Sequence, residues 1–545
     1  MRSRAPLLWP TGLGLPVVAA ALVLLPGLGG LDLWAPDEPR YAQVAEEMRS
    51  FEHDARGLVL LHLNGEAYSQ KPPLYYWLAA AFGSPFGHVG HWAARLPAAL
   101  AGIAVVGLTG LFGRRLFTRS QVGVIASLVL LGVLRFAHQA RRAQLDVILA
   151  LCELSALLAF WLIDRPESRH ERSRIGPLVW LHGSIALGLL TKGPVAALPY
   201  AIIIVFLLWE RRRDDLRRIF PFWGLVLAVG PAGAWLVASA ALAPTGFFHD
   251  AVTQNLLQRF FSVAHHARPI YYFFYQLPLD FLPWAPVALV ATGAAALSLR
   301  SATDRSSTDG RSRRFLLTWL ATFLVFFSLS MEKRGLYLLP AFPALALLSA
   351  DWLSRSLDRR ALPPWLSGGA ILFLSVLALC GLLGLLGFGQ GLMPALGSVQ
   401  LPKLLFLMIA GVAGFSAAML GWARWRMSNV QLELATLLLA PILLECVILL
   451  VFLPALNSEK SPRFVAEVVS EATTSDARVG VYRHSALSGG IEYYSGRRTV
   501  ALENSEALQE FLSAGGRIIV ARVRDEPQLR SLSGGRIISQ LREGR

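Results

Sequence analysis

The chain has 545 residues, of which 54% are hydrophobic and only 16% carry a charged side chain, and its formal net charge is +15. Soluble domains are about 45–50% apolar and about 25% charged, and a single soluble core stops growing at about 250–300 residues. These values exclude a soluble enzyme, a disordered chain and a fibrous protein. They predict a polytopic membrane protein.

Thirteen apolar segments approach or exceed the roughly 20 residues that a membrane span requires. They lie near 13–31, 96–113, 120–134, 145–163, 178–191, 193–209, 219–243, 272–298, 315–331, 335–350, 364–387, 402–422 and 432–453. The sequence therefore predicts an all-α polytopic membrane domain over residues 1–456, with about 13 transmembrane helices. The three cysteines lie far apart in apolar runs, so neither a disulfide framework nor a thiolate metal site is expected.

The basic residues are distributed unevenly between the two sides of these spans. If the N-terminus lies in the cytoplasm, the cytoplasmic segments hold 24 Lys and Arg in 76 residues, and the outer segments hold 12 in 110. This is the positive-inside asymmetry of membrane proteins, and it explains the basic charge without any nucleic acid. An odd number of spans then places the C-terminal tail outside the cell membrane.

The composition changes at Asn457, where the tail begins. Ser461-Pro462 is typical of a helix start and predicts a helix to about Ala472. Residues 478–483 alternate as a strand, Asn504 caps a second helix, and 517–523 predict another strand. We therefore expect residues 457–545 to form a small extracytoplasmic α/β domain.

The first outer loop, residues 32–90, is long for a connector, and long ordered loops are usually functional. Asp37 and Glu38 begin a helix whose residues Tyr41, Val44, Met48 and Phe51 share one face, which is typical of a helix lying along the membrane interface. These acids suit either simple helix capping or a site. Lys71, beside Pro72-Pro73, is either a lysine that extends to the interface or a ligand of a lipid phosphate.

Further charged residues lie at the outer ends of the spans. Asp146 stands at the start of a span, and Lys192 occupies a very short outer turn, where a cation is expected to meet an anion. The later outer segments add Arg259, His266, Arg268, Lys333 and Arg334. Cations that stabilise a departing phosphate, together with carboxylates that accept a proton, are what transfer from a phosphate leaving group requires.

An ordered set of these motifs resembles the bacterial aminoarabinose transferases that modify lipid A. These enzymes belong to the GT-C superfamily of membrane glycosyltransferases, as do the dolichyl-phosphate-mannose–protein mannosyltransferases. The resemblance covers roughly residues 30–350. It rests on Asp37-Glu38-Pro39-Arg40-Tyr41-Ala42, Gln70-Lys71-Pro72, Leu145-Asp146, Thr191-Lys192-Gly193, Gln258-Arg259-Phe260, His266-Ala267-Arg268-Pro269 and Lys333–Tyr337 with Leu339-Pro340.

The resemblance implies a GT-C-like fold with interfacial helices over a cavity between the spans. It implies transfer of a sugar, with inversion, from a polyprenyl-phosphate donor to an envelope lipid, glycan or protein acceptor at the outer leaflet of the bacterial inner membrane. By this resemblance Asp37 is the catalytic carboxylate, with Glu38 and Asp146 as helpers. The residues implied to bind the donor phosphate are Lys71, Lys192, Arg259 and Tyr337.

One position departs from the family pattern. The relatives hold a metal with a glutamate at the position of Gln70 and with the histidine matching His266. A neutral amide is a poorer ligand for a transition metal than a carboxylate, so we expect no tight divalent-metal site. A transporter or flippase for a lipid-linked anion is the alternative function, although the polar residues cluster at the outer ends of the spans rather than at the midplane.

Overall fold

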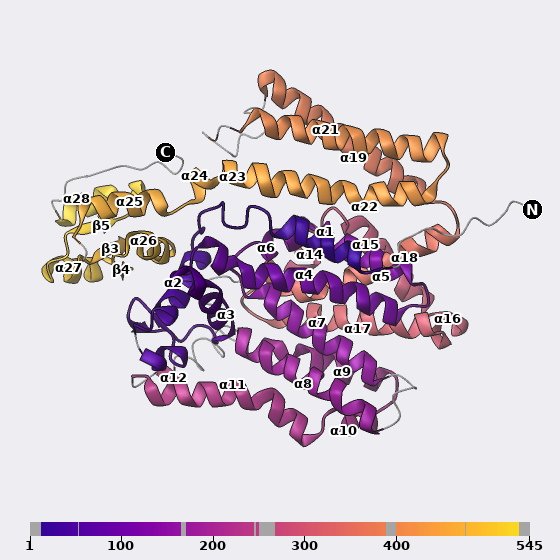
Figure 1. The fold of residues 1–545 in the computed structure, drawn as a ribbon, viewed down its shortest axis with the longest axis horizontal. Helices are drawn as coiled ribbons and strands as arrows, with labels where there is room; N and C mark the ends of the chain where they lie inside the picture. Colours follow the sequence, from indigo (N-terminus) through magenta and orange to yellow (C-terminus); the bar gives the residue numbers. More distant parts are fainter. Residues whose placement is uncertain are drawn as a thin grey trace, which may run out of the picture.

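The computed structural model of the chain (Figure 1) describes residues 12–52, 54–164, 171–244, 247–249, 268–388, 399, 401–474 and 476–533. Most of the chain is helical, because a helix satisfies its own backbone hydrogen bonds in an apolar medium. The long helices are α1 (Gly14–Leu24), α4 (His91–Leu116), α5 (Gln121–Leu131), α6 (Leu134–Ala140), α7 (Asp146–Ile163), α8 (Glu171–Lys192), α9 (Leu198–Trp209), α11 (Phe222–Leu242), α14 (Tyr272–Asp280), α15 (Ala285–Ser298), α17 (Thr308–Leu329), α18 (Phe342–Asp358), α19 (Pro364–Leu383), α21 (Lys403–Gly421) and α22 (Val430–Val447).

Short helices connect or extend these long ones. They are η4 (Gly193–Ala197), α10 (Asp215–Ile219), α12 (Phe247–His249), α16 (Ala302–Ser306), η6 (Gly335–Ala341), η7 (Gly384–Phe388), η9 (Trp422–Arg426), η10 (Ile448–Phe452) and α23 (Leu453–Ala455). Within the described ranges, nine helical stretches are long and apolar enough to cross a membrane, with Ile175–Trp209 (α8 to α9) counted as one, or ten if the bent pair α5 and α6 forms one span. The chain is thus an integral membrane protein, whereas the number thirteen stays a prediction.

The turn at Lys192 reverses the direction of the chain. His182 on α8 contacts the ring of Tyr200 on α9, with ring centroids 5.7 Å apart. A Cβ atom on Gly188 would lie 2.7 Å from the Cβ of Ala196. Gly188 and Ala196 are eight residues apart and would be separated by about 12 Å along a continuous helix. Because they are in contact instead, the chain turns back between them, and α8 and α9 form a hairpin. Lys192, the last residue of α8, is therefore placed at a helix end.

The first loop folds into a compact unit at one end of the helical bundle (Figure 1). It contains α2 (Asp37–Arg49), η1 (Asp54–Leu58), the antiparallel strands β1 (His62–Leu63) and β2 (Glu66–Ala67), α3 (Leu74–Gly83) and η2 (Ser84–Phe86). The expected apolar face of α2 is buried at Tyr41, Val44 and Met48. Phe51 lies beyond the end of α2 and is 56% exposed, so its assignment to this face was wrong.

The tail forms a small α/β unit. Its elements are α24 (Asn457–Lys460), α25 (Arg463–Ala472), β3 (Val479–Tyr482), η11 (Ser485–Leu487), α26 (Ser488–Ser495), β4 (Thr499–Leu502), α27 (Ser505–Ser513), β5 (Ile518–Val520), η12 (Val523–Asp525) and α28 (Glu526–Ser533). The three strands pair in parallel in the order β4-β3-β5. The Asn504 side chain accepts a hydrogen bond from Ala507 N at the start of α27.

Helix α26 was not predicted from the sequence. Gly489 and Gly490 near its start permit close packing. A Cβ atom on Gly489 would lie 2.9–3.2 Å from the Cβ, Cα and N atoms of Arg40, and one on Gly490 would meet Pro462. Helix α26 is therefore pressed against the first turn of α2, and Figure 1 shows the tail beside the first loop.

Hydrogen bonds reinforce this docking. The Tyr494 hydroxyl accepts a hydrogen bond from Leu33 N over 2.6 Å, and the Tyr493 hydroxyl donates to Val89 O over 2.9 Å. Asn457 donates to the Asp32 carboxylate through its side-chain amide, over 2.9 Å. The tail is thus fastened to both ends of the first loop.

We expect Gly489→Ala to weaken the docking of the tail, because its methyl group would collide with the Arg40 backbone. Overpacking of this kind costs about 1–3 kcal/mol. The measurement is thermal unfolding in detergent, together with the rate of proteolysis between α24 and α25. Gly411→Ala is the matched control, because nothing lies within 4 Å of a Cβ at Gly411. Equal behaviour of the two variants would contradict the close contact.

Candidate functional site

A cavity of about 1680 Å³ opens between the helical bundle, the first loop and the tail. Asp37, Lys71, Asp146, Lys192 and Tyr337 all line it. The sequence thus anticipated five residues that are far apart in the chain but share one cavity. The tail adds Arg478, Ser485, Ser488, Gly489, Glu492 and Arg498 to the same lining.

Part of the cavity lining, on the helices of the bundle, is apolar. Leu149 lies three residues beyond Asp146 on α7, and Leu189 lies three residues before Lys192 on α8. Each leucine is therefore about one helical turn deeper than its charged neighbour. Further apolar residues that line the cavity are Val229, Leu236, Phe326 and Phe327. The cavity therefore offers charged groups next to a surface suited to a hydrocarbon chain.

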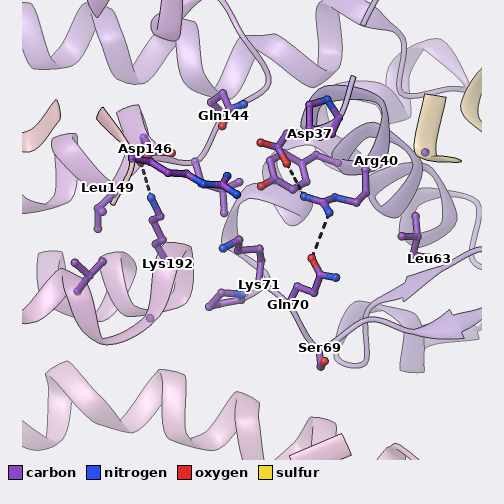
Figure 2. A pocket seen from close by; sticks show the side chains of 18 of the residues that line it. Asp37, Arg40, Leu63, Ser69, Gln70, Lys71, Gln144, Asp146, Leu149 and Lys192 are labelled. Atoms are coloured by element: carbon purple, nitrogen blue, oxygen red, sulfur yellow. Dashed lines mark hydrogen bonds and ion pairs between the residues drawn. The ribbon is translucent and has the colours of Figure 1, made fainter. Parts of the chain in front are cut away.

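Asp37 begins α2, but its carboxylate does not cap the helix. Pro36 is the N-cap residue and makes no side-chain capping bond. The Asp37 carboxylate instead forms a 2.5 Å ion pair with Arg40, and its side chain is 20% exposed. Arg40 also donates to Gln70 Oε1 over 3.3 Å. Figure 2 shows this chain of three side chains along one wall of the cavity.

Glu38 points away from Asp37 into the protein, because neighbouring residues on a helix differ by about 100° in direction. Its side chain is 1% exposed and is not among the residues that line the cavity. The carboxylate pairs with Arg95 at 2.9 Å and Arg142 at 3.4 Å, and it accepts hydrogen bonds from Trp34 N and Ala143 N. We expected Glu38 to assist Asp37 at the reaction site, but its carboxylate faces the protein interior.

The charge of Glu38 is stabilised by these partners. Burial by itself raises the pKa of the Glu38 carboxyl, but the charges of Arg95 and Arg142 and the hydrogen bonds outweigh burial and lower it to about 2. Glu38 is therefore an anion at neutral pH. It joins α2 to α4 and to the segment before α7.

Asp146 and Lys192 form the second ion pair of the cavity. Asp146 is the first residue of α7 and Lys192 the last residue of α8, and their side chains meet at 2.5 Å. The Lys192 Nζ atom also lies 5.0 Å from the centroid of the Tyr337 ring, in a cation–π contact. The anion that we expected beside Lys192 is therefore the Asp146 carboxylate.

Lys71 lies between the two ion pairs in the view of Figure 2, beside Gln70. Arg259 and His266 lie outside the described residues. Within the described ranges, no group of three or more His, Cys, Asp or Glu side chains is arranged to hold a metal ion. Gln70 is exposed, and its carbonyl oxygen accepts the bond from Arg40.

Two supporting residues had no assigned role from the sequence. Arg40 is within the first-loop motif, but only the structure pairs it with Asp37. Asp280 on α14 accepts a hydrogen bond from Gln276 over 2.9 Å, and a Cβ on Gly335 would lie 2.4 Å from its Oδ2 atom. Asp280 therefore packs against the start of η6, which carries Tyr337. Its only sequence signal was an acid within an apolar span.

The chain is similar in sequence to known glycosyltransferases. Residues 70–237 match the family described as dolichyl-phosphate-mannose-protein mannosyltransferase. The undecaprenyl phosphate-alpha-4-amino-4-deoxy-L-arabinose arabinosyl transferase of Shewanella sediminis is 26% identical over 489 residues, which cover 89% of this chain and 85% of that protein. The enzyme of the same name from Pseudomonas savastanoi pv. phaseolicola is 32% identical over 376 residues, covering 67% and 66%.

A solved structure shows the same fold. The crystal structure of ArnT from Cupriavidus metallidurans bound to undecaprenyl phosphate superimposes with a TM-score of 0.70. The match covers 94% of this chain and 90% of that one, at 22% sequence identity. The likeness extends over the helical bundle and most of the tail.

We expect Arg95→Gln to destabilise the protein by about 3–5 kcal/mol, because it leaves the buried Glu38 carboxylate without its main partner. Glu467→Gln is the control, since the Arg463–Glu467 pair is exposed and such pairs contribute about 0–1 kcal/mol. Thermal unfolding in detergent at neutral pH measures both. Equal losses of stability would refute the anchoring role.

The stability of the wild type should also depend on pH through Glu38. Its folded pKa of about 2 is below the ordinary value of 4.5, so its contribution is complete above pH 4.5 and is lost as the pH falls toward 2. Unfolding measured between pH 6 and pH 3 should show a smaller decline for Glu38→Gln than for the wild type. Parallel declines would mean that Glu38 is not held as an anion.

Proposed function

Because the chain is an integral membrane glycosyltransferase of the GT-C superfamily, similar to aminoarabinose transferases and protein mannosyltransferases, we propose that it takes its sugar from a polyprenyl-phosphate donor. The acceptor is an envelope lipid or glycan at the outer leaflet. The relatives named above use an undecaprenyl-phosphate aminoarabinose, according to their names.

One observation carries the proposal: the charged groups of the cavity adjoin its apolar side. Lys192 has three ammonium hydrogens, of which Asp146 takes one, and its side chain is 16% exposed. A phosphate next to Lys192 and Lys71 leaves the prenyl chain against Leu149, Leu189, Val229 and Phe326. An amphiphile with an anionic head therefore fits this side of the cavity.

The proposed reaction is a single displacement at the anomeric carbon. The bond from this carbon to the phosphate oxygen breaks, and the bond to the acceptor oxygen forms on the opposite face, with inversion. The Asp37 carboxylate accepts the proton of the acceptor hydroxyl, and the polyprenyl phosphate leaves with the electron pair of the broken bond. Lys71 and Lys192 stabilise the charge that develops on this phosphate.

The remaining residues have supporting roles in this proposal. Asp146 holds Lys192 in place, and Tyr337 covers its ammonium group. Glu38 positions the start of α2 rather than taking part in proton transfer. By the family resemblance, Arg259 is a further phosphate ligand. Because the Gln70 oxygen is neutral and is engaged by Arg40, the described residues do not fit a tight metal site with His266.

We place the protein in the bacterial inner membrane, with the N-terminus in the cytoplasm and the tail in the periplasm. The support is the excess of Lys and Arg in the segments opposite the cavity. The tail lies on the same side as the cavity, because it contributes to the lining. A cysteine-labelling experiment with a membrane-impermeant reagent tests this orientation.

The test of the function uses the purified full chain with a panel of polyprenyl-phosphate sugars and an envelope lipid extract. We expect Asp37→Asn to reduce kcat by about 10²–10⁴-fold, as for loss of a general base. Lys192→Met should raise the KM for the donor and lower kcat, because the leaving phosphate loses a cation. Mass spectrometry of the products and of the released lipid phosphate measures both.

Asp358→Asn is the matched control, because this exposed carboxylate pairs with Arg119 away from the cavity. Full activity of Asp37→Asn would remove Asp37 from the catalytic role. Absence of transfer with every donor, together with polyprenyl-phosphate binding that neither variant alters, would favour a flippase or binding protein.

A further inference from the structure

The segment between α17 and η6 contributes every second residue to the cavity lining, namely Ser330, Glu332, Arg334 and Leu336. The backbone is extended at Ser330, with φ −66° and ψ 142°, and at Arg334, with φ −129° and ψ 141°. Side chains alternate in direction along an extended chain. Glu332 and Arg334 are therefore neighbours on the side of the segment that faces the cavity.

Lys333, between them, points to the opposite side and is buried. Its Nζ atom donates hydrogen bonds to Ser330 O and, over 3.2 Å, to Arg268 O. The Ser330 hydroxyl donates to Glu332 O over 3.1 Å. These bonds hold the segment in place and engage the Lys333 ammonium group, so Lys333 does not neutralise the Glu332 carboxylate.

Glu332 is nearly buried, and its carboxylate is unpaired. The residue is 8% exposed, and within the described ranges its carboxylate forms neither an ion pair nor a hydrogen bond. The guanidinium group of Arg334, which is exposed, likewise has no partner among the described residues. A carboxylate that has lost most of its water without gaining a partner costs free energy. Both groups are therefore available to a ligand in the cavity.

This pair lies next to the place that the proposed reaction gives to the phosphate. Tyr337 N donates to Arg334 O over 3.0 Å, so one 3₁₀ turn of about 6 Å separates these residues. The Tyr337 ring centroid lies 5.0 Å from the Lys192 Nζ atom. The donor sugar is bonded directly to the phosphate that Lys192 is proposed to bind, so the sugar comes close to this segment. A carboxylate repels the phosphate, which leaves the sugar as the part that Glu332 can bind.

The charges of the pair indicate which kind of sugar fits. A hydroxyl group both donates and accepts hydrogen bonds, so hydroxyl groups can donate to Glu332 and accept from Arg334. An ammonium group would be repelled by Arg334, and a sugar carboxylate would be repelled by Glu332. Gln70, which also lines the cavity, adds no charge. An uncharged sugar therefore fits this wall better than an amino sugar or a uronic acid.

We propose that Glu332 and Arg334 select the sugar of the donor, by hydrogen bonding to the hydroxyl groups of an uncharged sugar. The inference rests on the proposed transferase function and specifies the substrate class of that same site. It also separates this chain from the relatives described above, whose names specify an aminoarabinose.

The first experiment measures use of the donor by the purified full chain with Glu332→Gln or Arg334→Gln. We expect each variant to raise the KM for a polyprenyl-phosphate donor of an uncharged hexose about tenfold, the loss typical of a hydrogen bond to a charged group. The thermal shift caused by undecaprenyl phosphate, which carries no sugar, should not change. Glu526→Gln and Arg530→Gln are the matched controls, since they remove the same charges from α28, outside the cavity lining.

The second experiment compares three donors with the same polyprenyl phosphate and an uncharged sugar, an amino sugar or a uronic acid. The wild type should use the uncharged sugar with the highest kcat/KM. Glu332→Gln leaves the positive Arg334 and should shift the preference toward the uronic acid, whereas Arg334→Gln should shift it toward the amino sugar. Glu332→Asp keeps the charge and should keep the wild-type preference. A merely structural defect would lower the use of all three donors in parallel.

Three results would overturn the inference. The wild type prefers the amino sugar or the uronic acid, the two variants shift the preference in the same direction or not at all, or either variant loses the thermal shift with undecaprenyl phosphate. In each of these results the wild type still transfers a sugar, so the transferase function stands. Failure of the wild type to transfer from any donor is a failure of the proposed function itself.

Discussion

The buried ion pair between Glu38 and Arg95 is the interaction on which the site depends. Arg95 also donates to the carbonyl oxygens of Leu28, Leu31 and Asp32, at the end of the segment after α1. Burying two charges away from water costs free energy unless all their hydrogen-bonding groups have partners. The partners of Glu38 and Arg95 come from four separate segments of the chain. The start of α2 is therefore held in one orientation, and Asp37 is directed to the cavity as a consequence.

The cavity uses its charged residues in pairs, one of which joins elements that are far apart in the chain and one of which lies within a single helical turn. Asp146 and Lys192 connect the beginning of α7 to the end of α8, and Asp37 and Arg40 share the first turn of α2. Pairing keeps these side chains in defined positions before any ligand arrives, which lowers the entropy lost on binding. Lysine retains further donors after pairing, so that an ordered position and anion binding are compatible.

The tail is part of the cavity rather than a separate appendage. Its glycines at the start of α26 let two backbones approach closely, and its tyrosines hydrogen-bond to both ends of the first loop. A wall built in this way brings residues after 470 next to Asp37. A change of sequence in the tail can therefore alter one wall of the cavity while the part that the helical bundle builds stays the same.

The sequence alone indicated the membrane class and identified Asp37, Lys71, Asp146, Lys192 and Tyr337 as candidates, because hydropathy and motifs can be read along the chain. Only the tertiary structure decided that Glu38 turns inward while Asp37 faces the cavity. It also decided that the Asp37 carboxylate pairs with Arg40 and does not cap the helix. It also decided that the tail reaches the site. These outcomes depend on which distant groups, such as Arg95 and Gly489, meet a residue in space, and no periodicity or spacing along the chain records such contacts.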